Sequence, residues 1–443
     1  MERSLRRRSL LRAAGVAGAV ALAGCPAGIG ESTGFEPGEA DWPSYRFDAC
    51  NNGVHPSAPG PGGDLSLAWT ATYREDAGAV PGMGQVSSPI VLDGTVAAAA
   101  NVQTRETAET VVAAFGLESG ERRWERSFPL TGEGGGEGGA SAQTLVSDGE
   151  RLVVATRSDG WALRALSPSD GETEWEHALD TPTRAPITAD SGSLVLGDQL
   201  YAVYDADDGS QQSRYETDQD RKWRNRYPPT VTEDTVFATA HDEIRAVDRE
   251  SGEARWTASN DFYSVLYQER GAPFNSPVVV DGVAYAVCGR IANRDTGGMV
   301  AIDVEDGSQL WTAIPEGDDP ANYEGDPEAF EQAAFYGIPF VLDDTVYAQG
   351  MGRGEWGVFA VDAADGAVER TENVGGLFAA DGVVYGASGG DRLSVSATDP
   401  AADEKLGTAT VDEWDAPRVG PQAIAGEYFL VATSEGIAAF GPN

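Results

Sequence analysis

Few side chains in this chain combine a type and a spacing that could do chemistry. Three histidines, His55, His177 and His241, are the only imidazoles, and they share no metal-ligand spacing. A zinc site is therefore not expected. Of the three cysteines, Cys50 and Cys288 could form a disulfide outside the cell, although their spacing does not show that they meet. No residue in these sets is assigned a catalytic role.

One acidic segment resembles a calcium loop. Asp205, Asp207 and Asp208 are followed by Gly209, and Glu216 stands at the twelfth position of such a loop. A calcium loop needs its glycine at the sixth position, and here the glycine is fifth. We therefore interpret the segment as a turn and expect no metal.

A single basic cluster stands out in the mature chain, and aromatic residues are interleaved with it. Such a cluster could bind an anionic ligand, a lipid headgroup or an acidic partner. The alternative, which we favour, is that these side chains pair with neighbouring carboxylates. The basic residues are Arg221, Lys222, Arg224 and Arg226.

An eleven-residue repeat indicates the structural elements that would position any site. An alanine is followed six residues later by glycine and ten residues later by tryptophan. Recurrence at intervals of roughly fifty residues indicates a repeat architecture. The four copies span 114–124, 165–175, 246–256 and 301–311, with the motif pairs Gly120 and Trp124, Gly171 and Trp175, Gly252 and Trp256, and Gly307 and Trp311.

A second phrase precedes most copies of the motif. Residues 88–94 read Ser-Pro-Ile-Val-Leu-Asp-Gly and return at 276–282 as Ser-Pro-Val-Val-Val-Asp-Gly. Short β-branched runs separated by Asp-Gly indicate strand, tight turn and strand. The alanine segment and the tryptophan segment supply two more strands. Four antiparallel strands per unit predict the blades of an all-β propeller, with each tryptophan packed between blades.

Counting the units gives an eight-bladed propeller, with seven blades as the alternative because two units are weak. Ser213 and Arg370 stand where the repeat would place tryptophan. The last unit ends one strand short, and residues 64–70, with Trp69 at the motif position, are expected to supply that strand. The ring would then close without an exposed edge. The propeller is expected to occupy residues 41–443.

This repeat resembles the pyrroloquinoline-quinone-like (PQQ-like) propeller repeat. The family includes quinoprotein alcohol dehydrogenases and BamB-type lipoprotein scaffolds, and residues 41–48 resemble the segment before the first blade of its non-enzymatic members. The resemblance implies two possible functions. One is binding or scaffolding without a cofactor. The other is a PQQ- and calcium-dependent dehydrogenase of an alcohol or sugar.

The enzymes of the family typically carry an adjacent cysteine pair, calcium held by Glu, Asn and Asp, and a catalytic Asp. This chain has no adjacent cysteines, and no stretch aligns with the calcium motif. We therefore expect a non-enzymatic binding or scaffold protein, with PQQ and calcium only under the alternative.

The N-terminus is expected to be a targeting segment. Arg7 and Arg8 begin a stretch that resembles a twin-arginine export signal, and Leu22-Ala23-Gly24-Cys25 resembles a lipobox. Residues 1–24 would be the signal peptide, Cys25 would carry the lipid, and residues 25–40 would form a flexible tether. The propeller would then sit lipid-anchored on the outer face of the cytoplasmic membrane.

The charge balance is strongly acidic. The chain has 31 Lys and Arg against 71 Asp and Glu, and loss of residues 1–24, with five Arg and one Glu, leaves a net charge of −44. Only Lys222 and Lys405 are lysines. Such self-repulsion is tolerable when molar salt screens it, which indicates a halophilic, haloarchaeal protein. Nucleic acid is excluded as a partner. We expect a monomer that binds a protein partner or small ligand at a propeller face.

Overall fold

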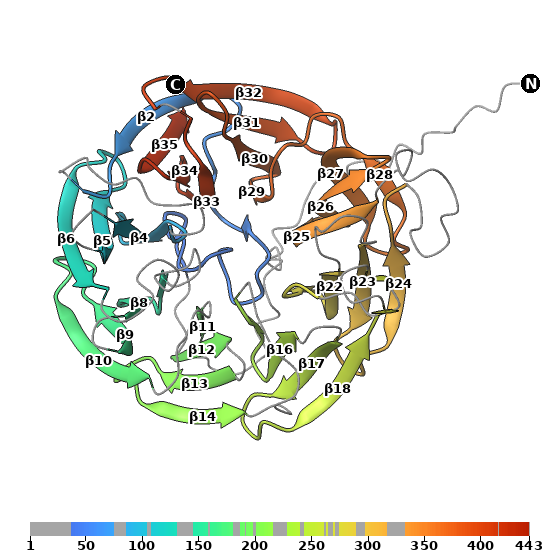
Figure 1. Ribbon diagram of the computed structural model, residues 1–443. Helices are drawn as coiled ribbons and strands as arrows, with labels where there is room; N and C mark the ends of the chain where they lie inside the picture. The colour runs from blue at the N-terminus through green and yellow to red at the C-terminus, as the bar shows by residue number, and fades with distance from the viewer. Residues whose placement is uncertain are drawn as a thin grey trace, which may run out of the picture.

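Eight β-sheets are arranged as blades around a central axis in the computed structural model of the protein (Figure 1). No helix occurs in the part of the chain that the structure describes. The predicted all-β, eight-bladed propeller is thereby confirmed, and the alternative of seven blades is wrong. The described residues are 37–442 without 75–85, 104–107, 131–144, 158–159, 180–186, 191, 198–200, 216–227, 240–242, 261–262, 265–268, 271–273, 289–296, 317–332 and 415.

Every blade has four antiparallel strands that run in order from hub to rim. Blade 1 consists of β3 (Ile90–Leu92), β4 (Thr95–Gln103), β5 (Ala108–Gly116) and β6 (Arg122–Pro129). Blade 2 consists of β7 (Leu145–Ser147), β8 (Leu152–Arg157), β9 (Trp161–Leu166) and β10 (Thr173–Leu179). Blade 3 consists of β11 (Ile187–Asp190), β12 (Ser193–Gly197), β13 (Tyr201–Asp205) and β14 (Gln211–Tyr215). Blade 4 consists of β15 (Thr230–Val231), β16 (Thr235–Thr239), β17 (Glu243–Asp248) and β18 (Ala254–Ser259).

The second half of the ring follows the same plan. Blade 5 consists of β21 (Val278–Val280), β22 (Val283–Cys288), β23 (Gly298–Asp303) and β24 (Gln309–Ala313). Blade 6 consists of β25 (Ala334–Leu342), β26 (Thr345–Gly352), β27 (Glu355–Asp362) and β28 (Val368–Arg370). Blade 7 consists of β29 (Phe378–Ala380), β30 (Val383–Ser388), β31 (Leu393–Asp399) and β32 (Glu404–Val411). Blade 8 consists of β33 (Val419–Ala425), β34 (Tyr428–Thr433), β35 (Ile437–Pro442) and β2 (Leu65–Ala71).

Two short additions complete the sheet inventory. Strand β1 (Val54–His55) pairs in parallel with β29 and makes blade 7 five-stranded. Strands β19 (Tyr263–Ser264) and β20 (Glu269–Arg270) form a separate hairpin between blades 4 and 5.

The predicted Asp-Gly phrases form the tight turns between first and second strands. Asp93 and Gly94 have φ angles of 48° and 65°, and Asp281 and Gly282 have 48° and 79°. Two successive positive φ angles define the type I′ turn, whose twist matches that of an antiparallel hairpin. The Asp-Gly sequence therefore explains the sharp turn after the hub strands of blades 1 and 5.

The ring closes through strands from opposite ends of the chain. Strand β2 pairs antiparallel with β35, from Leu65 opposite Pro442 to Ala71 opposite Ile437. In Figure 1 the blue β2 lies beside the dark red β35 at the rim. The prediction that an N-terminal strand completes the last blade is therefore confirmed.

The hydrophobic core is divided into layers between neighbouring blades. One such layer brings Ile90 and Val112 of blade 1 together with Leu145 and Val154 of blade 2. Inner strands are almost fully buried, whereas outer strands such as β10 alternate between exposed and part-buried positions. Within the described residues, no helix is long and apolar enough to span a membrane.

Candidate functional site at the propeller hub

The tryptophan motif residues lie at the seams between blades, away from the hub. At five seams the indole nitrogen of an outer strand donates a hydrogen bond to a backbone carbonyl in a turn of the next blade. The pairs are Trp69 to Leu117 (2.8 Å), Trp124 to Pro168 (2.8 Å), Trp175 to Ala206 (3.1 Å), Trp256 to Val304 (2.8 Å) and Trp311 to Ala363 (2.9 Å).

Each of these indole rings packs on the glycine of the same turn. A Cβ atom at Gly171, where φ is +70°, would lie 2.5 Å from the ring of Trp124. Glycine is therefore required both for the left-handed backbone and for the close approach of the ring. The other glycines under a tryptophan are Gly120, Gly209, Gly307 and Gly366. The motif tryptophans and glycines join neighbouring blades of the propeller, and their side chains are used in these contacts.

The seam between blades 3 and 4 uses a tyrosine in place of tryptophan. Ser213 pairs with Val203, the register position that tryptophan holds in other blades. Tyr215, two residues further on the same face of β14, donates a 3.1 Å hydrogen bond to Arg249 O and packs on Gly252. Sequence reasoning found the gap at Ser213 and missed the residue that fills it.

The seam between blades 6 and 7 is polar. Arg370 pairs with Phe359 and not with the motif residue Ala360, so its predicted placement at the tryptophan position is wrong. The reason is that β27 and β28 pair without the bulge that shifts the register of the tryptophan strands. Here the carboxylate of Asp403 accepts the backbone amides of Glu372 (2.7 Å) and Asn373 (2.9 Å).

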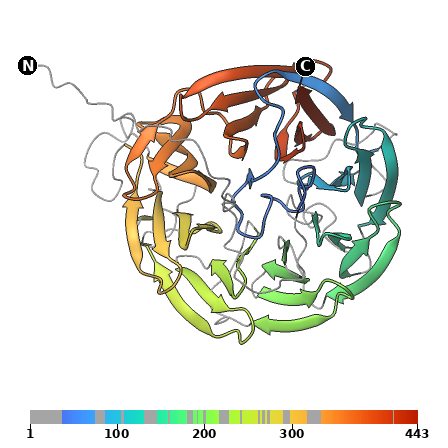
Figure 2. The same ribbon diagram turned by 180° about the vertical axis from the view of Figure 1, so that it is seen from behind.

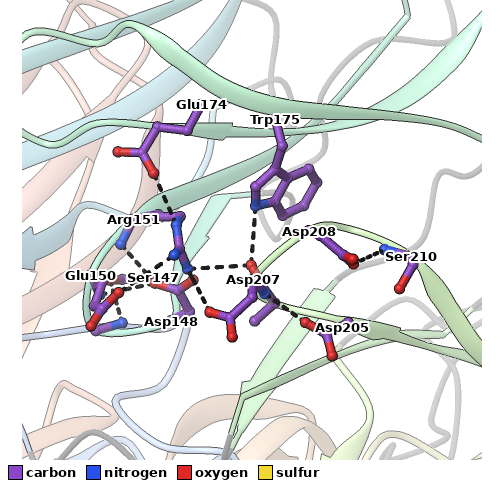
Figure 3. A network of polar contacts seen from close by, with 12 residues as sticks. Ser147, Asp148, Glu150, Arg151, Glu174, Trp175, Asp205, Asp207, Asp208 and Ser210 are labelled. Atoms are coloured by element: carbon purple, nitrogen blue, oxygen red, sulfur yellow. Dashed lines mark hydrogen bonds and ion pairs between the residues drawn. The ribbon is translucent and has the colours of Figure 1, made fainter.

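The acidic segment that resembles a calcium loop is part of a seam as well (Figure 3). Asp205 accepts the amide of Asp207 (2.8 Å), and Asp208 accepts that of Ser210 (2.8 Å). Asp207 forms an ion pair with Arg151 of blade 2 at 3.2 Å. These carboxylates therefore stabilise a turn and a blade contact.

The hub itself is crossed by residues 41–55, which we call the hub segment (Figures 1 and 2). Its backbone forms hydrogen bonds with the inner strands of several blades, which satisfies the polar groups of both partners. Trp42 and Val91 exchange two hydrogen bonds (2.8 and 2.9 Å). Inner-strand amides donate to the hub segment as follows: Ser147 to Pro43 O (2.7 Å), Val231 to Ala49 O (2.9 Å), Val279 to Cys50 O (3.3 Å) and Ala379 to Gly53 O (3.1 Å).

Arg46 is the main side-chain anchor of the hub segment. Its side chain is buried, and the residue is only 2% exposed. The guanidinium lies over the ring of Phe378 at 5.3 Å and donates to backbone carbonyls on three sides. The accepting oxygens belong to Asn51 (2.9 Å), Asn52 (3.2 Å), Ile338 (3.2 Å), Pro339 (2.9 Å) and Leu377 (3.2 Å).

Two titratable groups of the hub segment have shifted pKa values. Burial raises the pKa of Asp48 to about 6, although backbone amides and Arg46 oppose the shift. Burial lowers the pKa of His55 to about 4. The His55 ring contacts Asp41 O (2.9 Å) through Nε2 and accepts the amide of Ala58 (2.9 Å) at Nδ1. Its role is structural.

Next to the hub segment lies a cavity of about 370 Å³, which we call the hub cavity. Tyr45 and Arg46 of the hub segment contribute to its wall. The rest is lined mainly by blades 6, 7 and 8. The polar side chains there are Gln349, Arg418, Gln422, Thr433 and Ser434, and the described lining residues include no Asp, Glu or His.

Arg418 and Gln422 have unused hydrogen-bonding capacity at this cavity. The backbone of Arg418 is held by Ser434, whose hydroxyl accepts the Arg418 amide (3.0 Å) and whose amide donates to Arg418 O (2.9 Å). The exposed guanidinium of Arg418 has no hydrogen-bond or ion-pair partner in the described part of the chain. The Oε1 atom of Gln422 is buried and likewise lacks a donor there.

Comparison with known proteins identifies the family of this chain. Residues 108–372 match the sequence model of the family described as outer membrane protein assembly factor BamB. That match covers more than half of the chain. The chain belongs to this family. No curated protein matches the chain in sequence.

Solved structures share the fold of this BamB-family propeller. BamB from Moraxella catarrhalis superposes with a TM-score of 0.52 at 15% identity, over 86% of this chain and 100% of that one. Quinohemoprotein alcohol dehydrogenase from Comamonas testosteroni gives 0.57 at 15% identity, over 91% and 80%. A europium-containing methanol dehydrogenase gives 0.58 at 12% identity, over 89% and 90%. At such identities the likeness concerns the fold alone, which scaffolds and enzymes share.

The described lining of the hub cavity does not fit the calcium site that the sequence resemblance implies for the enzymes of the PQQ-like family. Calcium takes six to eight oxygen ligands, carboxylates prominent among them. The described lining residues offer only amide, hydroxyl and backbone oxygens. Nor do three or more His, Cys, Asp or Glu side chains cluster as metal ligands anywhere in the described residues.

Several predicted site residues lie outside the described part of the chain. They are the export arginines Arg7 and Arg8, the lipid-attachment residue Cys25, and the basic cluster Arg221, Lys222, Arg224 and Arg226. Of the two cysteines considered for a disulfide, Cys288 is a free, buried thiol, so Cys50 and Cys288 are not joined.

Proposed function

We propose that this BamB-family chain is a non-enzymatic binding or scaffold lipoprotein that takes a small ligand or protein partner at the face of the propeller where the hub cavity opens. The observation that carries the proposal is the chemistry of the hub cavity. Its described lining combines two arginines, two glutamines and hydroxyl groups without an Asp, Glu or His.

These side chains are better suited to binding a ligand than to oxidising an alcohol. Removing hydrogen from an alcohol requires a group that accepts the hydroxyl proton, which in proteins is usually His, Asp or Glu. Arginine stays protonated, and an amide is no base. The hub segment also anchors one side of the hub through Arg46, Asn51 and Asn52. A rigid wall of this kind suits a preformed binding pocket.

The location is proposed from the N-terminal sequence. Arg7 and Arg8 resemble a twin-arginine signal, and Cys25 follows a lipobox-like stretch. Lipid on Cys25 and a tether over residues 25–40 would hold the propeller at the outer face of the cytoplasmic membrane. The net charge supports a halophilic setting, in which molar salt screens the surface.

The competing function is oxidation of alcohols or sugars with PQQ and calcium. The test is dye-linked oxidation by the purified protein in molar salt after addition of PQQ and calcium, with heat-denatured protein as control. We expect dye reduction at the control rate and no change in melting temperature on adding PQQ. Saturable, protein-dependent turnover would overturn the proposal.

The basic cluster is a second candidate contact for an anionic partner. Capture of membrane components by the wild type is compared with capture by a variant in which Arg221, Lys222, Arg224 and Arg226 are replaced by Gln. Loss of a captured component from the variant would assign the cluster to binding. Unchanged capture would assign these side chains to pairing with carboxylates, as we expect.

A further inference from the structure

The hub cavity has a charge character opposite to that of the rest of the molecule. The chain carries 71 acidic against 31 basic residues, yet the described lining has Arg46 and Arg418 and no carboxylate. Cavity walls of one sign concentrate ligands of the opposite sign. An organic anion therefore meets less repulsion in this cavity than the net charge of the chain would suggest.

Arg418 differs from most arginines on the described surface. Ten of them form ion pairs with Asp or Glu: Arg74, Arg122, Arg151, Arg164, Arg245, Arg249, Arg255, Arg353, Arg370 and Arg392. The guanidinium of Arg418 has no such partner among the described residues. Its backbone, in contrast, is fixed on both sides by Ser434. An unpaired guanidinium on a fixed backbone can turn toward a carboxylate and bind it through two parallel hydrogen bonds.

Gln422 adds a hydrogen-bonding requirement for the ligand. Its Oε1 atom is buried without a donor, and leaving such an acceptor unsatisfied costs stability. Because this atom has almost no accessible surface, the Gln422 side chain must turn toward the cavity before a ligand reaches it, and a ligand O–H or N–H group would then recover that cost. Gln349, an exposed amide on β26 that also lines the cavity, offers both a donor and an acceptor. The cavity thus matches a ligand with hydroxyl groups as well as a negative charge.

The volume of the hub cavity limits the size of the ligand. A cavity of about 370 Å³ lies at the lower end of the range for small-molecule sites, roughly 300–1,000 Å³. It holds a single sugar-sized ring and excludes a folded domain. The side chain of Leu377 and the ring of Phe378 supply apolar wall beside the polar groups.

We infer that the hub cavity binds a small hydroxylated carboxylate of the sugar-acid class, with Arg418 on the carboxylate and Gln422 Oε1 accepting a ligand hydroxyl. This inference rests on the proposed binding function and names its ligand class. Arg46 contributes a fixed positive charge to the cavity wall, since its guanidinium donates to backbone carbonyls.

The test is isothermal titration in molar salt with four probes. D-glucuronate carries both features, glucose lacks the carboxylate, propionate lacks the hydroxyls, and glucose 6-phosphate replaces the carboxylate by phosphate. We expect saturable binding of glucuronate, and binding weaker by at least about tenfold for glucose and propionate. Equal binding of all four probes, or of none, would overturn the inference. Tighter binding of glucose 6-phosphate would overturn the carboxylate in favour of a phosphate ligand.

Matched variants locate the site. Arg418→Gln and Gln422→Leu should each weaken glucuronate binding about tenfold or more. Arg392→Gln is the control, because Arg392 is 57% exposed in its side chain, pairs with Asp412 and does not line the cavity. Circular dichroism and melting temperature of each variant without ligand show whether it is folded. Unchanged affinity in folded Arg418→Gln would contradict the inference.

The two proposals fail in distinguishable ways. If the protein reduces a dye with glucuronate as electron donor, the non-enzymatic function is wrong while the ligand class stands. If glucuronate neither binds nor is oxidised, the ligand class is wrong while a scaffold function stands.

Discussion

The indole nitrogen of Trp69 donates a 2.8 Å hydrogen bond to the carbonyl oxygen of Leu117, and this contact joins blade 8 to blade 1. Trp69 lies on β2, which also pairs with β35. One N-terminal strand therefore closes blade 8 through its backbone and closes the ring through its side chain.

Replacing Trp69 should destabilise the whole ring. Trp69→Phe loses the hydrogen bond and should cost about 1 kcal/mol of unfolding free energy. Trp69→Ala also empties a seam position that is 8% exposed, and should cost about 3–5 kcal/mol. Urea unfolding in molar salt measures both. Trp356→Ala is the control, because Trp356 is 53% exposed, and a loss as large as that of Trp69→Ala would contradict the closure role.

The glycine under Trp124 should be needed for space as well as for its backbone angle. Gly171 and Gly192 have similar φ angles, +70° and +73°, but only Gly171 has a ring against it. Gly192→Ala should therefore cost about 1 kcal/mol through strain alone, and Gly171→Ala about 1–3 kcal/mol more through overlap with Trp124.

A double variant separates the two effects at Gly171. In Trp124→Ala, the added cost of Gly171→Ala should fall to that of Gly192→Ala. If that cost is the same with and without the indole ring, contact with Trp124 does not explain the glycine.

The repeat could be predicted because its signals are local. The Asp-Gly turns require positive φ angles that few other pairs adopt, and the motif tryptophans keep one register against their alanine partners. Tyr215 could not be predicted because it lies two residues after the motif position. Ser213 at that position is too small to fill the seam, and Tyr215 fills it from the same face of the strand. Asp403 was missed because its contact with Glu372 and Asn373 depends on how two blades dock.

The hub cavity could not be predicted from the sequence. Arg418 and Gln422 belong to no repeat motif, and Arg46 lies about 370 residues before them in the chain. Only ring closure brings the hub segment beside blades 6 to 8. The one signal in the sequence was the resemblance of residues 41–48 to the segment before the first blade of non-enzymatic members.

Stability should depend on pH through Asp48. Its pKa is raised to about 6, so the folded state favours the protonated form, and the carboxylate costs stability as pH rises through about 4 to 6. Asp48→Asn should thus be more stable than the wild type above pH 6, by up to about 3 kcal/mol, and equal to it near pH 4. Urea unfolding at pH 4 and 7.5 measures the difference.

The wild-type protein at each pH is the reference for Asp48→Asn. His55, with a pKa lowered to about 4, makes the wild type less stable as pH falls from 6.5 to 4, but it acts in both proteins and cancels in the comparison. A difference between Asp48→Asn and wild type that grows as pH falls would have the wrong sign for this account.

Membrane attachment should depend on Cys25. With the lipid, the expressed protein should sediment with membranes, and its mass should exceed that of the chain from residue 25 onward by that of the attached lipid. Cys25→Ser should be released into the soluble fraction. Membrane retention of Cys25→Ser would show that the anchor is elsewhere.

The account depends most on the hub segment occupying the hub, and amide hydrogen exchange measures this directly. The amides of Val231, Val279 and Ala379 donate to carbonyls of the hub segment, namely Ala49 O, Cys50 O and Gly53 O. We predict that these three amides exchange as slowly as those in the middle strands of their blades, since both open only on global unfolding. Exchange as fast as that of an exposed turn, with the middle strands still protected, would contradict the account because it would mean that the hub is open to water.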